Sequence, residues 1–239
     1  MKTFKLTILG VFVLLILTTG CIDNFAIRGN GIETVEERNT SNFDKVKSSG
    51  DFVVHITEGE NLEVIVKAEQ NIIPYIETFV SNDELKVEII GFHNIINRLP
   101  MEVYITVPSL TGISQSGSGA ITTDNFTTDH LDLAISGSGY ISTVANASEI
   151  DAFISGSGKL DISGEANTAN FNISGSGKIQ SYDLALHDCN ARISGSGHMW
   201  VTAEQILHAI ISGSGNVFYS GNPEIEVHIS GSGHLIHEN

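Results

Sequence analysis

The chain is poor in cysteine, proline and basic residues. Its 239 residues include 2 cysteines, 4 prolines and 1 tryptophan. Two cysteines, Cys21 and Cys189, are too few for a disulfide framework. Lys and Arg together number 12 against 28 Asp and Glu, which gives a formal net charge of −16. Because phosphate groups need basic contacts, a surface this acidic argues against a nucleic-acid partner and against docking on anionic lipid through a basic patch.

Glycine is abundant, and its positions are periodic. The chain has 24 glycines and is 41% hydrophobic, a content that argues against disorder. Ser-Gly-Ser-Gly occurs seven times at spacings of 18–20 residues. The copies begin at Ser116, Ser136, Ser155, Ser174, Ser194, Ser212 and Ser230. Repetition at this period, without a helical pattern, is typical of a solenoid.

The residues around each copy form apolar columns. Isoleucine stands directly before the first serine in all copies but the first, which has Gln115. Apolar residues also recur three and five positions before that serine and five positions after it. This period of two indicates strands with one buried face. The sequence therefore predicts an all-β, single-stranded parallel β-helix, or β-solenoid, over 111–239, with seven SGSG coils and with Cys189 in its core.

The repeat motif allows two arrangements of its serines. If the strand runs unbroken, both serines point outward and both glycines inward, where the missing side chains let opposite walls approach. If instead a glycine adopts positive φ and turns a corner, the second serine faces the other way. We favour outward serines.

The N-terminus is typical of an exported protein. Residues 1–20 combine Lys2 and Lys5 with an apolar run of signal-peptide length. Cys21 follows Leu-Thr-Thr-Gly, which resembles a lipoprotein cleavage site, although Thr18 replaces the usual aliphatic residue. We expect lipid attachment at Cys21; an uncleaved N-terminal helix is the alternative. The polar residues 21–40 are interpreted as a tether.

Residues 41–110 are also rich in alternating apolar residues. Within them, Val46–Gly50 (VKSSG) looks like a degenerate start of the repeat. We expect this stretch to begin or cap the same solenoid, because terminal coils must differ from the rest to prevent edge-to-edge addition.

These features together resemble the head GIN domain family. The resemblance rests on Asn42–Val46 (NFDKV), Gly50–Val54 (GDFVV), the SGSG coils, and Tyr219–Pro223 (YSGNP). It covers nearly everything from about residue 41 onward. It implies a right-handed parallel β-helix on the cell envelope and an adhesin role, and it supplies no catalytic residues. No translocator barrel is evident, so the auto-transporter part of the description does not carry over.

A polar column lies four residues before each repeat and is the candidate binding surface. Its members are Asp132, Asp151, Asn170, Asn190, His208 and Glu226. Stacked carboxylates at Asp132 and Asp151 would lie about 5 Å apart, as a cation or a retaining glycosidase requires. The two stacked asparagines are interpreted as an amide ladder.

Three functions stay open at this point. The leading hypothesis is a non-catalytic envelope lipoprotein that binds an extracellular glycan or protein through a repetitive face. The alternatives are a polysaccharide lyase or hydrolase and a scaffold without an external ligand. No catalytic residue, cofactor or metal site is predicted, and His228, His234 and His237 are interpreted as surface residues. Homo-oligomerisation is a further possibility.

Overall fold

The structure, a computed structural model, describes residues 26–91 and 93–238 and is built almost entirely of β-strands. The predicted signal peptide and Cys21 lie outside the described residues. No helix within these ranges has the length and apolar character needed to cross a bilayer. Sixteen strands form one continuous sheet, and two more form a separate pair.

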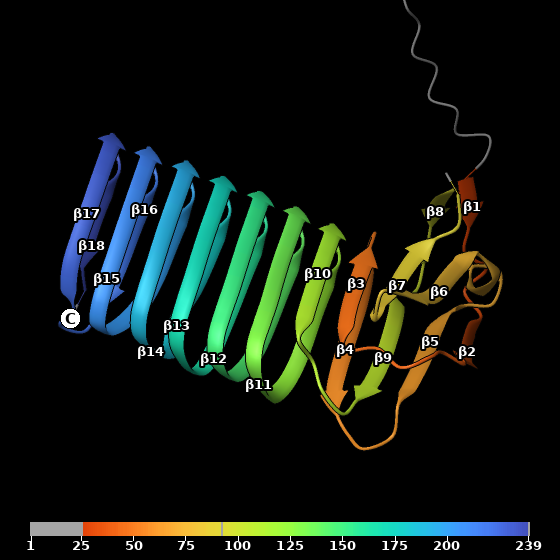
Figure 1. Cartoon of the computed structure of the whole chain (residues 1–239). Helices are drawn as coiled ribbons and strands as arrows, with labels where there is room; N and C mark the ends of the chain where they lie inside the picture. The colour runs from red at the N-terminus through yellow and green to blue at the C-terminus, as the bar shows by residue number, and fades with distance from the viewer. Residues whose placement is uncertain (1–25, 92, 239) are drawn as a thin grey trace, which may run out of the picture.

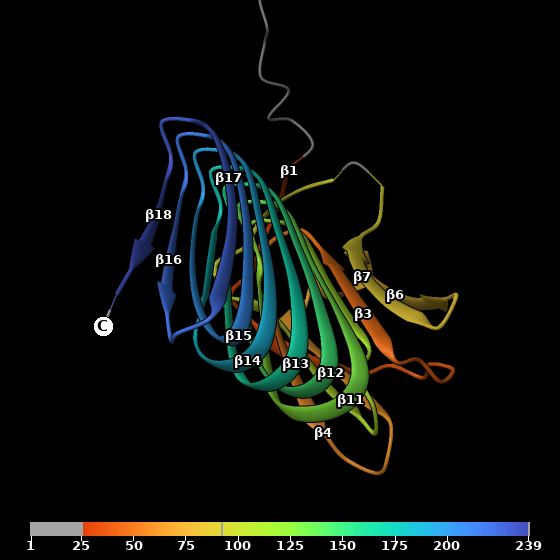
Figure 2. The same cartoon turned by 60° about the vertical axis from the view of Figure 1, so that its left-hand side comes forward.

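The repeats form a β-solenoid, as predicted, in which each middle coil is one long curved strand (Figures 1 and 2). These strands are β11 (Ala120–Gly137), β12 (Tyr140–Gly156), β13 (Lys159–Gly175), β14 (Lys178–Gly195) and β15 (His198–Gly213). Neighbouring strands pair in parallel, with the residues around each SGSG motif opposite their equivalents, and register shifts farther along three of the four pairings accommodate coils of different length. The shared period therefore sets the register.

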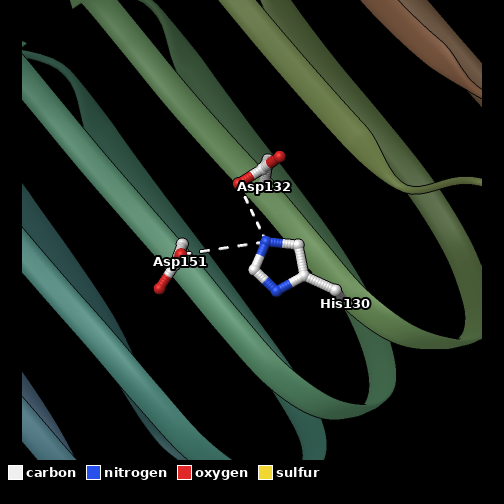
Figure 3. Close-up of side chains that lie close together, drawn as sticks. All are labelled: His130, Asp132 and Asp151. Atoms are coloured by element: carbon white, nitrogen blue, oxygen red, sulfur yellow. Dashed lines mark hydrogen bonds and ion pairs between the residues drawn. The ribbon is translucent and has the colours of Figure 1, made fainter.

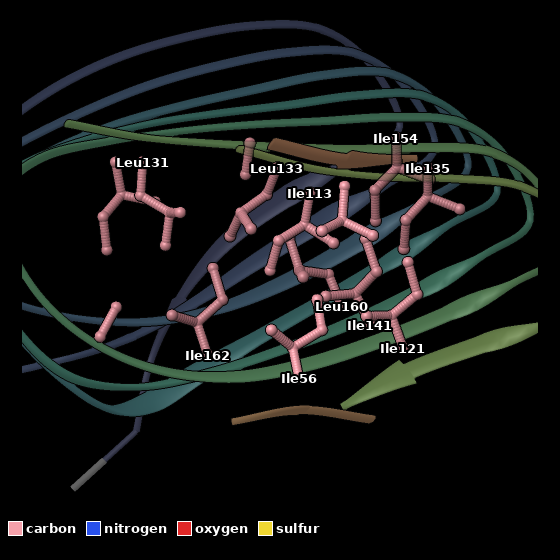
Figure 4. Close-up of a cluster of buried hydrophobic side chains, with 14 of the residues drawn as sticks. Ile56, Ile113, Ile121, Leu131, Leu133, Ile135, Ile141, Ile154, Leu160 and Ile162 are labelled. Atoms are coloured by element: carbon pink, nitrogen blue, oxygen red, sulfur yellow. The ribbon is translucent and has the colours of Figure 1, made fainter. Parts of the chain in front are cut away.

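The predicted apolar columns form the core inside the coils (Figure 4). Ile135, Ile154 and Ile173, from successive coils, are at most 1% exposed. Cys189 lies in the same core and is 0% exposed, as its column predicts. Because no coil encloses its apolar face alone, stacking is what removes these side chains from water.

The SGSG motif makes a corner between successive strands. In all seven copies the first glycine has positive φ, from 102° to 128°. The second glycine is buried, whereas both serines are exposed in every copy from Ser136 to Ser214. The outward orientation of the serines is confirmed, but the unbroken strand proposed as its reason is wrong. Hydrogen bonds from Ser157 N to Gly137 O and from Lys159 N to Gly139 O continue the stack through the corner.

The solenoid begins before the first SGSG copy. Strand β10 (Gly112–Gly117) pairs with β3 (Lys45–Ser49), and β11 pairs with β4 (Phe52–Glu58), all in parallel. The degenerate repeat at Val46–Gly50 is therefore confirmed as part of a coil. An earlier coil consists of β7 (Glu84–Ile89) and β9 (Met101–Val107), which pair in parallel with β3 and β4.

Antiparallel strands close this end of the stack. They are β2 (Glu33–Glu37), β5 (Glu63–Glu69) and β6 (Ile76–Ser81), with a 3-10 turn at Ile73–Tyr75. Strand β6 pairs with β7, β5 pairs with β9, and β2 pairs with β5. β1 (Ala26–Arg28) pairs separately with β8 (Asn94–Ile96). The predicted tether at 21–40 is therefore corrected for residues 26–37, which belong to the folded body because their backbone pairs with other strands.

The last coil lies at the opposite end. It consists of β17 (Glu224–Gly231) and β18 (His234–His237), which follow β16 (Asn216–Ser220). β17 pairs with β15 and β18 pairs with β16. Ile229 continues the isoleucine column here but is 40% exposed, because no coil of the described chain covers it.

Candidate functional site

The six residues of the predicted polar column lie next to one another on one face of the solenoid, a set we call the polar ladder. In order along the stack these are Asp132, Asp151, Asn170, Asn190, His208 and Glu226, each directly opposite the next. Buried residues flank each of the first five in sequence, and all six side chains are exposed or partly exposed. The structure thus brings together every residue of the column.

Hydrogen bonds fix the middle of the polar ladder. Asn190 Nδ2 donates to Asn170 Oδ1 at 2.8 Å, which confirms the predicted amide ladder. Asn170 Nδ2 donates in turn to Asp151 Oδ1 at 2.7 Å and to Glu149 Oε1 at 2.9 Å. These side chains therefore have defined positions, although they are partly exposed.

His130 joins the polar ladder at its end nearest the N-terminus (Figure 3). Its Nε2 lies 3.1 Å from Asp132 Oδ1 and 3.7 Å from Asp151 Oδ2. Its Nδ1 lies 3.5 Å from Glu149 Oε2. Burial lowers the pKa of His130, but three nearby carboxylates raise it more, so the net pKa is above the ordinary value of 6.5.

Sequence reasoning did not identify His130 or Glu149. Both stand two residues before a member of the polar ladder and are paired with each other across adjacent coils. They therefore form a second outward column beside the first, since residues two apart in a strand point to the same side. Extending the column comparison by two positions would have found them.

A shallow open groove of about 730 Å³ runs along the polar ladder. Its lining includes five ladder residues and the outward column two positions further along the strands. That second wall provides Phe153, whose side chain is 48% exposed, and Arg192. The groove therefore combines carboxylates, amides, one aromatic ring and one guanidinium group, with room for an extended ligand rather than an enclosed small molecule.

The family of this chain is established by its sequence. The family model described as "Putative auto-transporter adhesin, head GIN domain" matches residues 42–223. The chain belongs to this family. A comparison with curated protein sequences finds no match.

Solved structures share the fold of this head GIN domain protein. One is a "putative adhesin" from Bacteroides fragilis, which is 23% identical with a TM-score of 0.83. The match covers 89% of this chain and 100% of that one. Two proteins from Parabacteroides distasonis are also similar. A "putative lipid binding protein" is 24% identical with a TM-score of 0.76, covering 90% of this chain and 100% of that one. A "putative adhesin" is 23% identical with a TM-score of 0.72, covering 89% and 100%.

Proposed function

We propose that this protein is a non-catalytic adhesin of the cell envelope that binds an extracellular glycan in the groove along the polar ladder. Its family description and the names of its structural relatives support an adhesive role. Lipid attachment at Cys21 would hold it at the membrane, with the solenoid projecting outward. This location follows from the export signal and the lipoprotein-like site in the sequence.

The observation that carries the proposal is the groove itself. Amide and carboxylate groups held by mutual hydrogen bonds match the hydroxyls of a sugar without reorganising, which limits the entropy cost of binding. The exposed ring of Phe153 offers an apolar surface for one face of a sugar ring. Repeated positions along the stack give several weak contacts to a repetitive chain, so that total affinity rises with ligand length.

Three other functions compete with this proposal. A polysaccharide hydrolase or lyase would use Asp132 and Asp151, which do lie on adjacent coils. However, His130 Nε2 lies within 3.7 Å of both carboxylates, so they do not face each other as a free pair. A scaffold without an external ligand is the other alternative, and a lipid ligand is suggested by the name of one relative.

The decisive experiment measures retention on immobilised polysaccharides together with release of sugar ends. We expect retention without release, and a weakening of at least fivefold in Phe153→Ala, the order of one lost aromatic contact. Val144→Ala is the matched control, because Val144 is also exposed, at 38%, but does not line the groove. Equal retention of both variants would place the binding surface elsewhere. Sugar release would identify an enzyme, and absence of retention would favour the scaffold.

A further inference from the structure

At one end of the polar ladder, carboxylate oxygens of Asp132 and Asp151 lie close to the same ring nitrogen of His130 (Figure 3). His130 contributes Nε2, and Asp132 and Asp151 each contribute a carboxylate oxygen. All three atoms lie within 4.8 Å of one another. Two of the residues come from one strand and the third from the next coil, so the stacking of coils creates this arrangement.

The spacing of these atoms suits a shared metal ion. Imidazole nitrogen and carboxylate oxygen bind first-row ions at about 2.0–2.2 Å, which places neighbouring ligand atoms of a tetrahedral shell roughly 3.3 Å apart. The distances from His130 Nε2 to the two aspartate oxygens are 3.1 Å and 3.7 Å. They bracket that value, and the two aspartate oxygens lie within 4.8 Å of each other, so side-chain rotation would bring all three atoms around one ion.

Neighbouring residues already orient the ligands. The amide nitrogen of Asn170 donates one hydrogen bond to Asp151 Oδ1 and another to Glu149 Oε1. The second oxygen of Asp151 is thereby left near His130 Nε2, and the second oxygen of Glu149 lies 3.5 Å from His130 Nδ1. When an ion replaces the proton on Nε2, the carboxylate beside Nδ1 accepts the remaining N–H and holds the ring in place, the usual arrangement of a metal-bound histidine. Glu149 and Asn170 are therefore positioning residues.

The local charge also favours a cation. Three carboxylates surround the single imidazole of His130. The nearby basic group is Lys45, whose Nζ lies 3.9 Å from the other oxygen of Asp132 and is partly exposed. A divalent ion between the carboxylates would offset the remaining negative charge more fully than one ammonium group at the edge of the cluster does.

We propose that His130, Asp132 and Asp151 bind one first-row divalent metal ion, with Zn²⁺ preferred over Mn²⁺ and both over Ca²⁺. One imidazole with two carboxylates suits borderline ions, whereas Ca²⁺ takes six to eight oxygen ligands. The site opens into the groove, so further coordination positions are accessible to water or to a ligand oxygen. This inference goes beyond the proposed adhesion, because ion binding requires no glycan.

The test is calorimetric titration of the full chain in mild detergent with ZnCl2, MnCl2 and CaCl2, without any glycan. We expect one stoichiometric Zn²⁺ site that weakens at least tenfold in both His130→Ala and Asp151→Asn. His187→Ala is the matched control, because His187 is an exposed histidine whose ion pair, with Glu204 at 4.0 Å, is at the distance limit. Asn170→Ala should weaken Zn²⁺ binding several-fold while keeping all three ligands.

A second readout locates the ion. Side-chain nitrogen NMR of the histidines should show Zn²⁺ shifting the His130 Nε2 resonance first, because direct coordination changes that nitrogen specifically. Absence of a stoichiometric site would overturn the proposal. So would equal losses in His130→Ala and His187→Ala, which would indicate adventitious binding by surface histidines. Preference for Ca²⁺ that His130→Ala leaves unchanged would show a carboxylate-only site and overturn it as well.

Discussion

Adding one methyl group at the second glycine of an SGSG corner should destabilise the solenoid measurably. At Gly177, a Cβ atom would lie 2.5 Å from Ile154 Cγ2 and 3.0 Å from Gly158 O. Ordinary carbon–carbon contacts are about 3.5–4.0 Å, so Ile154 would have to move by roughly 1 Å into a filled core. Gly177 has no positive φ, which makes this a packing effect alone.

The expected magnitude is about 2 kcal/mol for Gly177→Ala. Overpacking a core costs about 1–3 kcal/mol, and alanine regains part of this because glycine loses more entropy when a strand forms. For a protein of this size, the unfolding temperature should fall by about 4–8 °C, measured by circular dichroism.

Three further substitutions separate the packing effect from the backbone effect. Ser176→Ala alters an exposed neighbour and should change stability by less than about 0.5 kcal/mol. Gly31→Ala isolates the backbone cost of placing alanine at a positive φ, here 76°, because the new Cβ would have no atom within 4 Å. Gly175→Ala combines both effects, since φ is 128° and the new Cβ would lie 2.5 Å from Gly156 O. If Gly177→Ala melted within 1 °C of the wild type, the packing argument for the corner would be refuted.

Two further predictions concern buried groups. Burial raises the pKa of the Cys189 thiol to about 12. Alkylation of Cys189 at pH 8, measured by mass spectrometry of its peptide, should therefore be negligible until the protein is unfolded. Rapid labelling of the native protein would contradict the buried position. Desolvation tends to raise the pKa of Glu69, but backbone N–H donors from Arg98, Gly31 and Leu99 outweigh it, and the net pKa is below its ordinary 4.5. A carboxylate whose pKa is lower in the folded than in the unfolded protein stabilises the fold at any pH above its unfolded-state pKa. This stabilisation is lost as the pH falls through the folded-state pKa. Urea unfolding should therefore show a larger deficit for Glu69→Gln at pH 7 than at pH 3, and an equal deficit at both would exclude this linkage.

The repeat pattern was sufficient to predict the solenoid and the outward position of the polar ladder. In a parallel stack of equal coils, a residue's place in the repeat fixes both its neighbour and its orientation, because equivalent positions pair with one another. That is why Asn170 and Asn190 could be placed in contact from spacing alone. The same logic placed Cys189 in the core.

Residues 26–37 show where this reasoning stops. Their polar composition resembles a tether, yet β2 pairs with β5 and β1 pairs with β8, segments that are distant in the sequence. Such pairings belong to no repeat, so no internal comparison reveals them. Glu69 is similar, because its backbone donors come from separate loops that only the fold brings together.

The sequence by itself determined the period, the buried columns and the polar face of this protein, because stacking identical units leaves few choices of register. Tertiary structure alone decided the corner at the first glycine, the antiparallel closure of one end and the contacts of His130. Each of these depends on backbone torsions, side-chain rotation or distant pairing, and an alternating pattern of apolar and polar residues specifies none of them.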